Sequence, residues 1–471
     1  MTESTPENSQ KMSLKQGVLT VMSLMIGSGI FSTANAIHQA TGSPLVALGI
    51  FLLTGLFSLT GALCYAELGT MIPGSGGEAQ YLKRGIGSWA AALFDWTSIV
   101  IMKPGGLAVF SLPFASHMLS ALAYIKQFKF FEDEDVMYKV ETGIALGMIW
   151  FVTFAACASV KRCDQIVSVL TYSKLVALGA IILLGFINAF REPMIFMNNF
   201  QGAMSTKVQN FSFLKFSQSL YEGLFSFDGW NNLNIVAGSL SNPKRNLPLA
   251  IWISVCVVLA LYLFTMLGYY AVLDDTTFMN TVVLAIDFGF RIFGKPGAII
   301  FAILVCLSVF AAALSGMTTS SEIIILSAKN CYFPSFLGNI NKKTGTAVYA
   351  YLSQGVIASL FLLIPRIISK GAFKMLIDVY TLPTWLFYGA CVVVLVMMRF
   401  REPKVERPYK VWPTTPVMFL IACIWLVAVA FYGDWKLPTV AFSLVLGGVP
   451  IYMMRRAGMK VAARKSAIEY N

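Results

Sequence analysis

The stretch MIGSGIF, from Met25 to Phe31, interrupts an apolar run that is long enough to cross a membrane. It places two glycines and a serine inside that run, where a helix in lipid depends on its own backbone hydrogen bonds. Exposing unpaired backbone groups to hydrocarbon is costly, so a broken helix is expected there only where it lines a cavity or binds a ligand. The alternative is close packing, because small residues let helix backbones approach each other in membranes.

The composition of the whole chain is that of an integral membrane protein. Of its 471 residues, 57% are hydrophobic and 12% are charged, whereas soluble domains average about 45–50% apolar and about 25% charged residues. Apolar runs of about 20 residues, the length that crosses a bilayer, recur along the whole chain. We therefore predict an all-α integral membrane protein with about twelve spans. These lie at residues 14–38, 44–70, 89–122, 141–159, 165–190, 213–239, 248–273, 297–328, 346–365, 372–398, 416–433 and 437–454.

The distribution of charge predicts the orientation in the membrane. The formal net charge is +12, and the basic clusters fall on one side if the spans alternate. By the positive-inside rule, this side and both termini are cytoplasmic. The basic excess then indicates contact with the lipid bilayer, whose cytoplasmic surface is anionic, and we expect no nucleic-acid partner. We expect a multi-pass protein of the plasma membrane.

The positions and spacing of the cysteines and histidines do not favour a metal site or a structural disulfide. None of the eight cysteines lies in a predicted exterior loop, and neither a CxxC motif nor a Cys/His metal-ligand spacing occurs. Structural disulfides, a metal site and a cofactor are therefore not expected. The sequence contains no enzyme motif either.

A second interruption, Phe227-Asp228-Gly229, falls within the sixth predicted span. Five spans separate it from the first, and an odd offset puts the two halves of the chain in opposite orientation. We predict an inverted repeat, with the first repeat at 14–190 and the second at 213–398. A helix pair at 416–454 follows the repeats, and cytoplasmic tails lie at 1–13 and 455–471.

The two breaks have the chemistry to bind an α-amino acid. The half-helix that begins after Gly27, Ser28 and Gly29 presents free N–H groups and a positive dipole end, which favour a carboxylate. The unwound carbonyls before the breaks are acceptors suited to an ammonium: those of Met25, Ile26, Phe225 and Ser226.

Several side chains near the breaks have two open interpretations. Asp228 either caps the half-helix that follows it or contacts a cation in a water-filled cavity. Lys174, in the fifth span, is either a fixed cation that replaces a bound sodium ion or a side chain that snorkels to the cytoplasmic surface. Lys103 and Glu322 are further interior charges that could serve in coupling. The aromatic residues that could wall a pocket are Phe225, Phe227, Trp230 and Trp385.

Motifs along nearly the whole chain resemble those of the L-type amino-acid transporters. These motifs are GSGIF at 27–31, GALCYAELGT at 61–70, SGG at 75–77, KL at 174–175, GLF at 223–225, GWN at 229–231, NLPLA at 246–250, IDFG at 286–289 and ERPYKV at 406–411. L-type transporters are the light-chain subunits of heteromeric amino-acid transporters, within the amino acid–polyamine–organocation superfamily. The resemblance covers residues 14–455.

The resemblance implies a LeuT-like fold, with five-plus-five inverted repeats and discontinuous first and sixth helices, and sodium-independent exchange of amino acids by alternating access. It also implies that Gly27, Ser28 and Gly29 meet the substrate carboxylate, that Phe225 is a gate and that Asn231 belongs to the site. Lys174 matches the family's lysine at a sodium-site position. The segments FDGWNNLN at 227–234, IMKP at 101–104 and WLFYG at 385–389 look most like the subtype that accepts cystine, cationic and neutral amino acids.

Three positions depart from the family pattern. Ala237-Gly238-Ser239 stands where the family usually has Thr-Glu-Glu, and Glu322 stands where it commonly has a basic residue. The predicted exterior loop at 123–139 lacks the cysteine that bonds the family's heavy chain. We therefore expect no disulfide-linked heavy chain, which leaves a non-covalent one open.

We predict an exchanger of neutral amino acids, with cationic substrates as an extension. The interior carboxylates Asp228 and Glu322 keep open a proton-coupled or uniport permease. A receptor that binds amino acids without transporting them is a further alternative.

Overall fold

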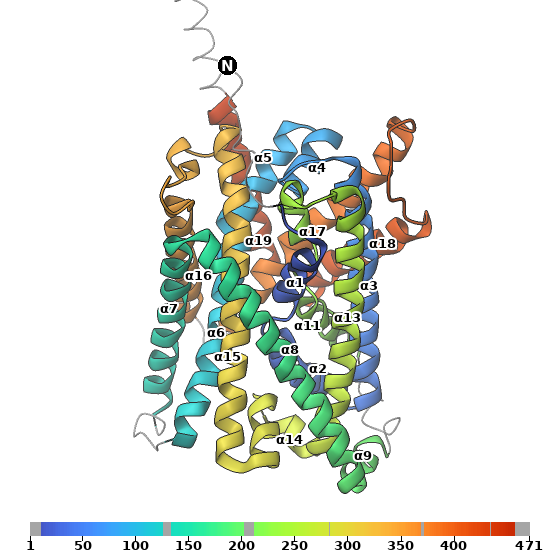
Figure 1. Cartoon of the computed structure of the whole chain (residues 1–471), viewed down its shortest axis with the longest axis vertical. Helices are drawn as coiled ribbons and strands as arrows, with labels where there is room; N and C mark the ends of the chain where they lie inside the picture. The colour runs from blue at the N-terminus through green and yellow to red at the C-terminus, as the bar shows by residue number, and fades with distance from the viewer. Residues whose placement is uncertain are drawn as a thin grey trace, which may run out of the picture.

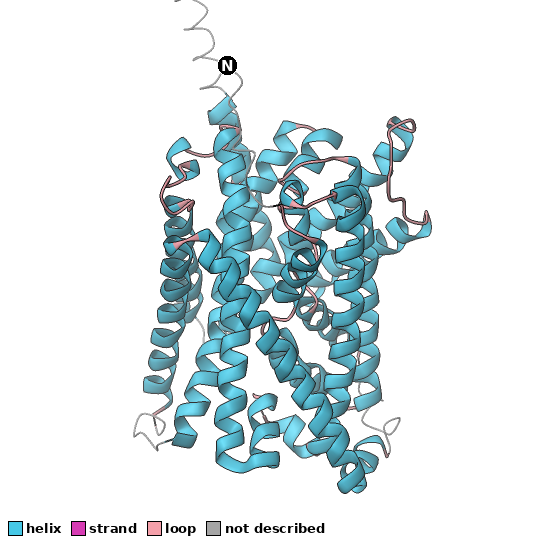
Figure 2. Ribbon diagram, viewed as in Figure 1, coloured by secondary structure: helices cyan, strands magenta, loops and turns pink. Residues whose placement is uncertain are grey.

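The computed structural model describes residues 11–125, 133–201, 212–281, 283–368, 372–433 and 435–456. Across these ranges the chain is a bundle of helices joined by short loops (Figure 2). The predicted tails at 1–13 and 455–471 and the predicted loop at 123–139 lie partly outside the described residues.

The first half of the chain forms one broken helix and several continuous ones. The elements are α1 (Leu14–Met25), α2 (Gly29–Thr41), α3 (Pro44–Met71), α4 (Glu78–Gly85), α5 (Ser88–Thr97), a π-helical turn η1 (Ser98–Met102), α6 (Lys103–Ile125), α7 (Glu134–Ala158), α8 (Val160–Arg191) and α9 (Pro193–Phe200).

The second half begins with the other broken helix. Its elements are α11 (Phe213–Ser226), α12 (Asn232–Ile235), η3 (Ala237–Ser239), α13 (Pro243–Val272), α14 (Asp275–Asn280), α15 (Leu284–Lys329), η4 (Ser335–Gly338), α16 (Val348–Ile368), α17 (Ala372–Arg401), α18 (Thr414–Gly433) and α19 (Lys436–Leu446).

In the described part of the chain, ten helices are long and apolar enough to cross a membrane, and the pair α1 and α2 makes an eleventh span bent by 43°. The remaining expected span, at 213–239, is divided between α11, α12 and η3. The expected span at 297–328 is part of a longer helix, α15, which begins at Leu284. Gly294 bends this helix with a φ of 66°, a left-handed value that glycine adopts at little cost.

Side-chain caps fix where several helices start. Ser13 and Gln16 form a capping box before α1, and the Ser43 hydroxyl accepts the N–H of Val46 before α3. The Asp133 carboxylate accepts two backbone N–H groups before α7, which therefore starts seven residues ahead of the expected position at 141. Such caps satisfy N–H groups that have no acceptor within the helix.

The two broken helices lie inside the bundle. In Figure 1, α1, α2 and α11 lie among the longer helices, with α4 and α5 at the upper end and α9 and α14 at the lower end. α1 packs against α13 and α15, and α11 packs against α2 and α3. The outer helices expose large apolar side chains such as Phe151 on α7 and Val176 on α8, as expected of surfaces that face lipid.

Candidate functional site

The first break lies where the sequence predicts it, between Met25 and Gly29. The N–H of Gly27 donates to the carbonyl of Met25 at 2.9 Å, and the N–H groups of Phe31 and Ser32 donate to the carbonyl of Ser28 at 3.1 and 3.0 Å. The first N–H groups of α2 have no acceptor within the helix. The start of α2 therefore offers a positive dipole end inside the bundle.

The second break also lies where the sequence predicts it. α11 ends at Ser226, and a turn through Gly229 leads to the short α12. Gly229 has a φ of 109°, a conformation that favours glycine. A Cβ at this position would lie 3.0 Å from the Cβ of Leu24. The two breaks, about 200 residues apart in the chain, therefore contact each other.

Gly29 allows α2 to approach the end of α11. A Cβ on Gly29 would lie only 2.5 Å from the Cα of Ser226, closer than carbon atoms can pack. The hydroxyls of Thr33 and Ser226 are 2.5 Å apart beside this contact. Gly29 therefore allows close helix packing, as the alternative interpretation expects, and it also lies at a break in the helix.

A cavity lies where the two breaks meet, and α6, α15, α16 and α17 complete its wall. Of the residues predicted for the site, the following line it: Met25, Gly27, Gly29, Lys103, Phe225, Asp228 and Asn231. The following do not: Ile26, Ser28, Ser226, Trp230, Trp385, Lys174 and Glu322. Ser28 is fully buried, and its hydroxyl has no hydrogen-bond partner among the described residues.

Tyr262 on α13 bridges the two breaks. Its hydroxyl lies 2.8 Å from the carbonyl of Met25 and 3.1 Å from the carbonyl of Ser226. The hydroxyl of Ser308 on α15 lies 3.3 Å from the carbonyls of both Ile26 and Gly27. A carbonyl has two lone pairs, so these predicted ammonium acceptors are partly, not fully, occupied by the protein.

Sequence reasoning missed Tyr262, although the sequence contained a signal. The residue lies in the middle of an apolar span, and a buried tyrosine hydroxyl needs a hydrogen-bond partner. The sequence does not identify that partner, because the partner is a carbonyl of an unwound segment on another helix.

Asp228 faces α17, and its carboxylate accepts hydrogen bonds from two tyrosines there. The hydroxyl of Tyr388 donates to Oδ1 at 2.9 Å, and the hydroxyl of Tyr380 donates to Oδ2. The N-cap position of α12 is Asn231, which makes no side-chain cap. The capping interpretation of Asp228 therefore receives no support, and its carboxylate belongs to the cavity wall.

The four predicted aromatic residues divide into two groups, because only Phe225 lines the cavity. Phe227 is fully buried and packs against Tyr262 at a centroid distance of 5.0 Å, so the expectation that it walls the pocket is wrong. Phe225 lies in the wall, with its ring centroid 6.4 Å from that of Phe110 on α6. Trp230 and Trp385 instead pack behind Tyr388, at centroid distances of 4.8 and 5.5 Å. The expectation that the two tryptophans wall the pocket is corrected, since they support a tyrosine that does.

Lys174 is buried and points into the protein. Its Nζ donates to the carbonyl of Ser23 on α1 at 2.6 Å, and the residue has no exposed surface. The snorkelling interpretation is therefore wrong. Lys174 instead holds α1 two residues before that helix ends at Met25. Glu322 lies on α15 outside the cavity wall.

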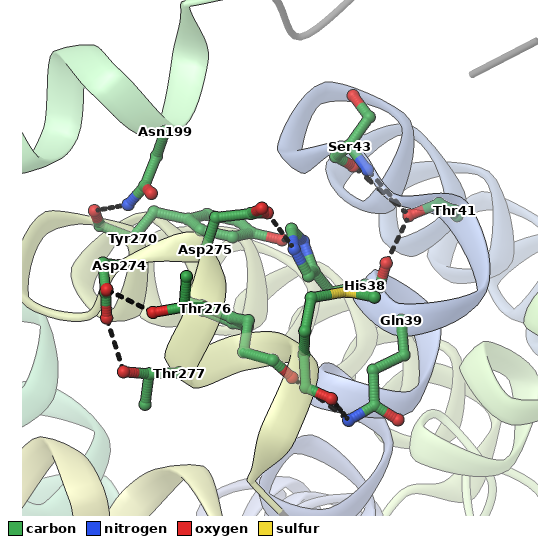
Figure 3. Close-up of polar contacts among 12 residues, drawn as sticks. His38, Gln39, Thr41, Ser43, Asn199, Tyr270, Asp274, Asp275, Thr276 and Thr277 are labelled. Atoms are coloured by element: carbon green, nitrogen blue, oxygen red, sulfur yellow. Dashed lines mark hydrogen bonds and ion pairs between the residues drawn. The ribbon is translucent and has the colours of Figure 1, made fainter. Parts of the chain in front are cut away.

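The far end of α2 is fixed by a polar group at the α14 end of the molecule (Figure 3). His38 contacts the Tyr270 hydroxyl through Nδ1 at 3.0 Å and the Asp275 carboxylate through Nε2 at 2.9 Å. Next to His38, Gln39 donates to the carbonyl of Phe278 at 3.1 Å. These contacts attach α2 to both α13 and α14.

Asp274 stabilises the first turn of α14 in the same group. Its carboxylate accepts hydrogen bonds from the hydroxyls of Thr276 and Thr277 (Figure 3). These hydrogen bonds lower the pKa of Asp274 below its ordinary value, because they favour the ionised form.

The sequence is similar to known amino-acid transporters along most of its length. A family model described as amino acid permease matches residues 12–453. The b(0,+)-type amino acid transporter 1 of Mus musculus is 30% identical over 94% of this chain and 88% of its own length. The Asc-type amino acid transporter 1 of Mus musculus is 30% identical over 91% of this chain and 78% of its own.

A third relative is a subunit by name. The large neutral amino acids transporter small subunit 2 of Mus musculus is 29% identical over 91% of this chain and 78% of its own length. The family model covers far more than half of the chain, in agreement with the motifs that resemble L-type transporters. This chain therefore belongs to the amino acid permease family and is a multi-pass membrane transporter of amino acids.

Proposed function

We propose that this chain is a sodium-independent exchanger of neutral amino acids, and of cationic ones as well, that works by alternating access. The observation that carries the proposal is the cavity between two contacting helix breaks. One wall of this cavity is the positive end of α2, and another carries the carboxylate of Asp228.

The substrate is oriented by its two backbone charges. Its carboxylate meets the first turn of α2 at Gly27 and Gly29, where helix N–H groups favour an anion. Its ammonium uses the remaining lone pairs of carbonyls at Met25 and Phe225. The side chain then extends toward Asp228 and the tyrosines of α17.

Sodium independence is supported by Lys174. Its ammonium reaches a carbonyl of α1 just before the first break, so it supplies a positive charge that a bound cation would otherwise bring. Because this ammonium belongs to the chain itself, transport would need no sodium gradient. We expect leucine uptake to be unchanged when choline replaces sodium.

The proposed architecture is a LeuT-like pair of inverted repeats at 14–190 and 213–398, followed by the helix pair at 416–454. The start of α1 lies close to the end of the second break, since the N–H of Met12 donates to the carbonyl of Ser239 at 2.8 Å. We further propose that both termini are cytoplasmic and that the protein resides in the plasma membrane. Epitope tags at either end should react with antibody only after cells are permeabilised.

A heavy-chain partner, as the small-subunit name of one relative suggests, would bind without a disulfide. The support is the absence of cysteine at 123–139. A complex of this kind should survive native electrophoresis and separate in non-reducing detergent gels.

The experiment that tests the proposed function is uptake of radiolabelled leucine, arginine and cystine into proteoliposomes that contain the purified protein. Competition by each of the twenty amino acids should rank the substrates. An imposed pH gradient should leave uptake unchanged, whereas acceleration by an inward proton gradient would favour the proton-coupled permease. Binding of leucine without measurable uptake would favour the receptor.

A further inference from the structure

A chain of four polar side chains connects the cavity with α4. The Nζ of Lys103 donates to Oδ1 of Asn232 at 2.9 Å, and Nδ2 of Asn232 donates to Oδ1 of Asn231 at 3.2 Å. Nδ2 of Asn231 then donates to Oε1 of Glu78 at 2.5 Å. The chain therefore has an ammonium at the cavity and a carboxyl group at its far end.

Three irregular segments bring these residues together. Lys103 follows the π-helical turn η1, a distortion that changes the direction of the side chains around it. Asn231 and Asn232 follow the left-handed Gly229 in the second break. Glu78 is the first residue of α4 and follows Gly77, whose φ is 48°. The arrangement depends on local backbone distortions of all three segments.

Burial makes this chain sensitive to charge. The exposed fractions of Glu78, Asn231 and Asn232 are 1%, 4% and 6%. Burial raises the pKa of Glu78, whereas the hydrogen bond from Asn231 and the positive charge of Lys103 oppose that rise. Glu78 and Lys103 therefore interact electrostatically through the two amides that separate them.

Lys103 and Asp228 line the same cavity with opposite charges. The Asp228 carboxylate is held by Tyr380 and Tyr388, and the Lys103 ammonium is held by Asn232. A cationic substrate side chain in this cavity is attracted by Asp228 and repelled by Lys103, while a neutral side chain experiences neither force strongly. The relative strength of the two interactions decides how well cationic substrates compete with neutral ones.

We propose that Lys103 is a specificity-determining residue that disfavours cationic amino acids, and that Glu78 is a positioning residue that holds Lys103 in place through Asn231 and Asn232. This inference rests on the proposed transport function and adds to it a determinant of substrate charge. Glu78 does not line the cavity, so it does not contact a substrate there.

The test compares kcat/KM for arginine with kcat/KM for leucine in proteoliposomes. Lys103→Met removes the charge and keeps an unbranched side chain, and we expect the arginine-to-leucine ratio to rise at least about tenfold, because like charges in a protein interior repel strongly. Asn232→Asp places a carboxylate beside the ammonium and should raise the ratio as well. Lys83→Met removes a lysine from the surface of α4 and should leave the ratio unchanged.

The positioning role of Glu78 is tested by a double-mutant cycle. Glu78→Ala removes the acceptor of Asn231 and should raise the ratio, whereas Glu78→Gln keeps an acceptor oxygen and should preserve it. In a Lys103→Met background, Glu78→Ala should have no further effect on the ratio. A general loss of structure would lower both rates and leave the ratio where it was.

The outcomes separate this inference from the proposed function. Absence of leucine uptake by the unmodified protein would contradict the proposed function. Normal leucine uptake with an unchanged ratio in both Lys103→Met and Asn232→Asp would overturn the specificity role alone. An effect of Glu78→Ala on the ratio that persists without Lys103 would overturn the positioning role.

Discussion

At the scale of single residues, the first break depends on a contact that only glycine permits. Any side chain at Gly29 would overlap the backbone of Ser226 on α11. The same contact brings the first turn of α2 to the cavity wall. A substitution there therefore alters helix packing together with the end of α2 at which we propose that the substrate carboxylate binds.

We predict that Gly29→Val abolishes leucine uptake while the protein is still produced. Overpacking of this kind typically costs about 1–3 kcal/mol of stability, so the midpoint of thermal unfolding should also fall. Gly49→Ala is the matched control, because a Cβ at Gly49 meets nothing within 4 Å. Normal uptake by Gly29→Val would contradict the assignment of this glycine to the site.

Asp228 provides a second test at this scale. We predict that Asp228→Gly reduces arginine uptake at least about tenfold more than leucine uptake, since a hydrogen bond to a charged group contributes about 1.5–3 kcal/mol. Initial rates for both substrates should be measured on the same preparation. An equal loss of the two rates would indicate that Asp228 serves mainly to hold Tyr380 and Tyr388.

At the scale of helices, two unwound segments from distant parts of the chain are held together by a side chain of another helix, α13. The Tyr262 hydroxyl contacts a carbonyl on each side, so α13 supports both breaks at once. Unwound backbone inside a membrane protein needs such partners. The hydroxyl thereby stabilises the relative position of α1 and α11.

Tyr262→Phe should lower the rate of leucine uptake and the midpoint of thermal unfolding. The aromatic packing remains, while the two buried carbonyls lose the one hydroxyl proton that they share. Loss of that donor leaves a buried acceptor less well satisfied, which corresponds to about 1–3 kcal/mol. Tyr349→Phe, at a residue that is 54% exposed, serves as the control. Wild-type values for both quantities in Tyr262→Phe would show that the bridge is dispensable.

His38 makes the corresponding contact at the other end of α2. His38→Leu removes the partner of Tyr270 and Asp275, so we predict faster amide hydrogen exchange in α14. Exchange in the middle of α18, which packs mainly against α17 and α3, should not change. Unaltered protection of residues 275–280 would mean that α14 is held by its other contacts.

At the scale of the whole molecule, the sequence predicted what depends on composition and local pattern. The breaks at 27–29 and 227–229 and the membrane spans follow from hydropathy and from residues that favour interruption. The cavity wall from α6, α16 and α17 did not follow, because it depends on how separate helices are rotated against one another. Lys174 shows this limit, since only the rotation of α8 decides whether its side chain reaches Ser23 or the membrane surface.

The tryptophans are a second case in which the sequence does not predict helix rotation. The sequence pattern places Trp230 and Trp385 near the cavity, but helix rotation puts Tyr388 in the cavity wall and the two tryptophans against Tyr388. The polar chain from Lys103 to Glu78 could not be predicted either, because it joins three segments through backbone distortions that hydropathy does not reveal.

The central claim is exchange of amino acids through the cavity between the two breaks. Its most direct test is uptake of radiolabelled leucine, in sodium-free buffer, into proteoliposomes that contain either unlabelled leucine or no amino acid. We predict rapid uptake with internal leucine and almost none without it. Equal uptake in the two preparations would contradict the exchange mechanism.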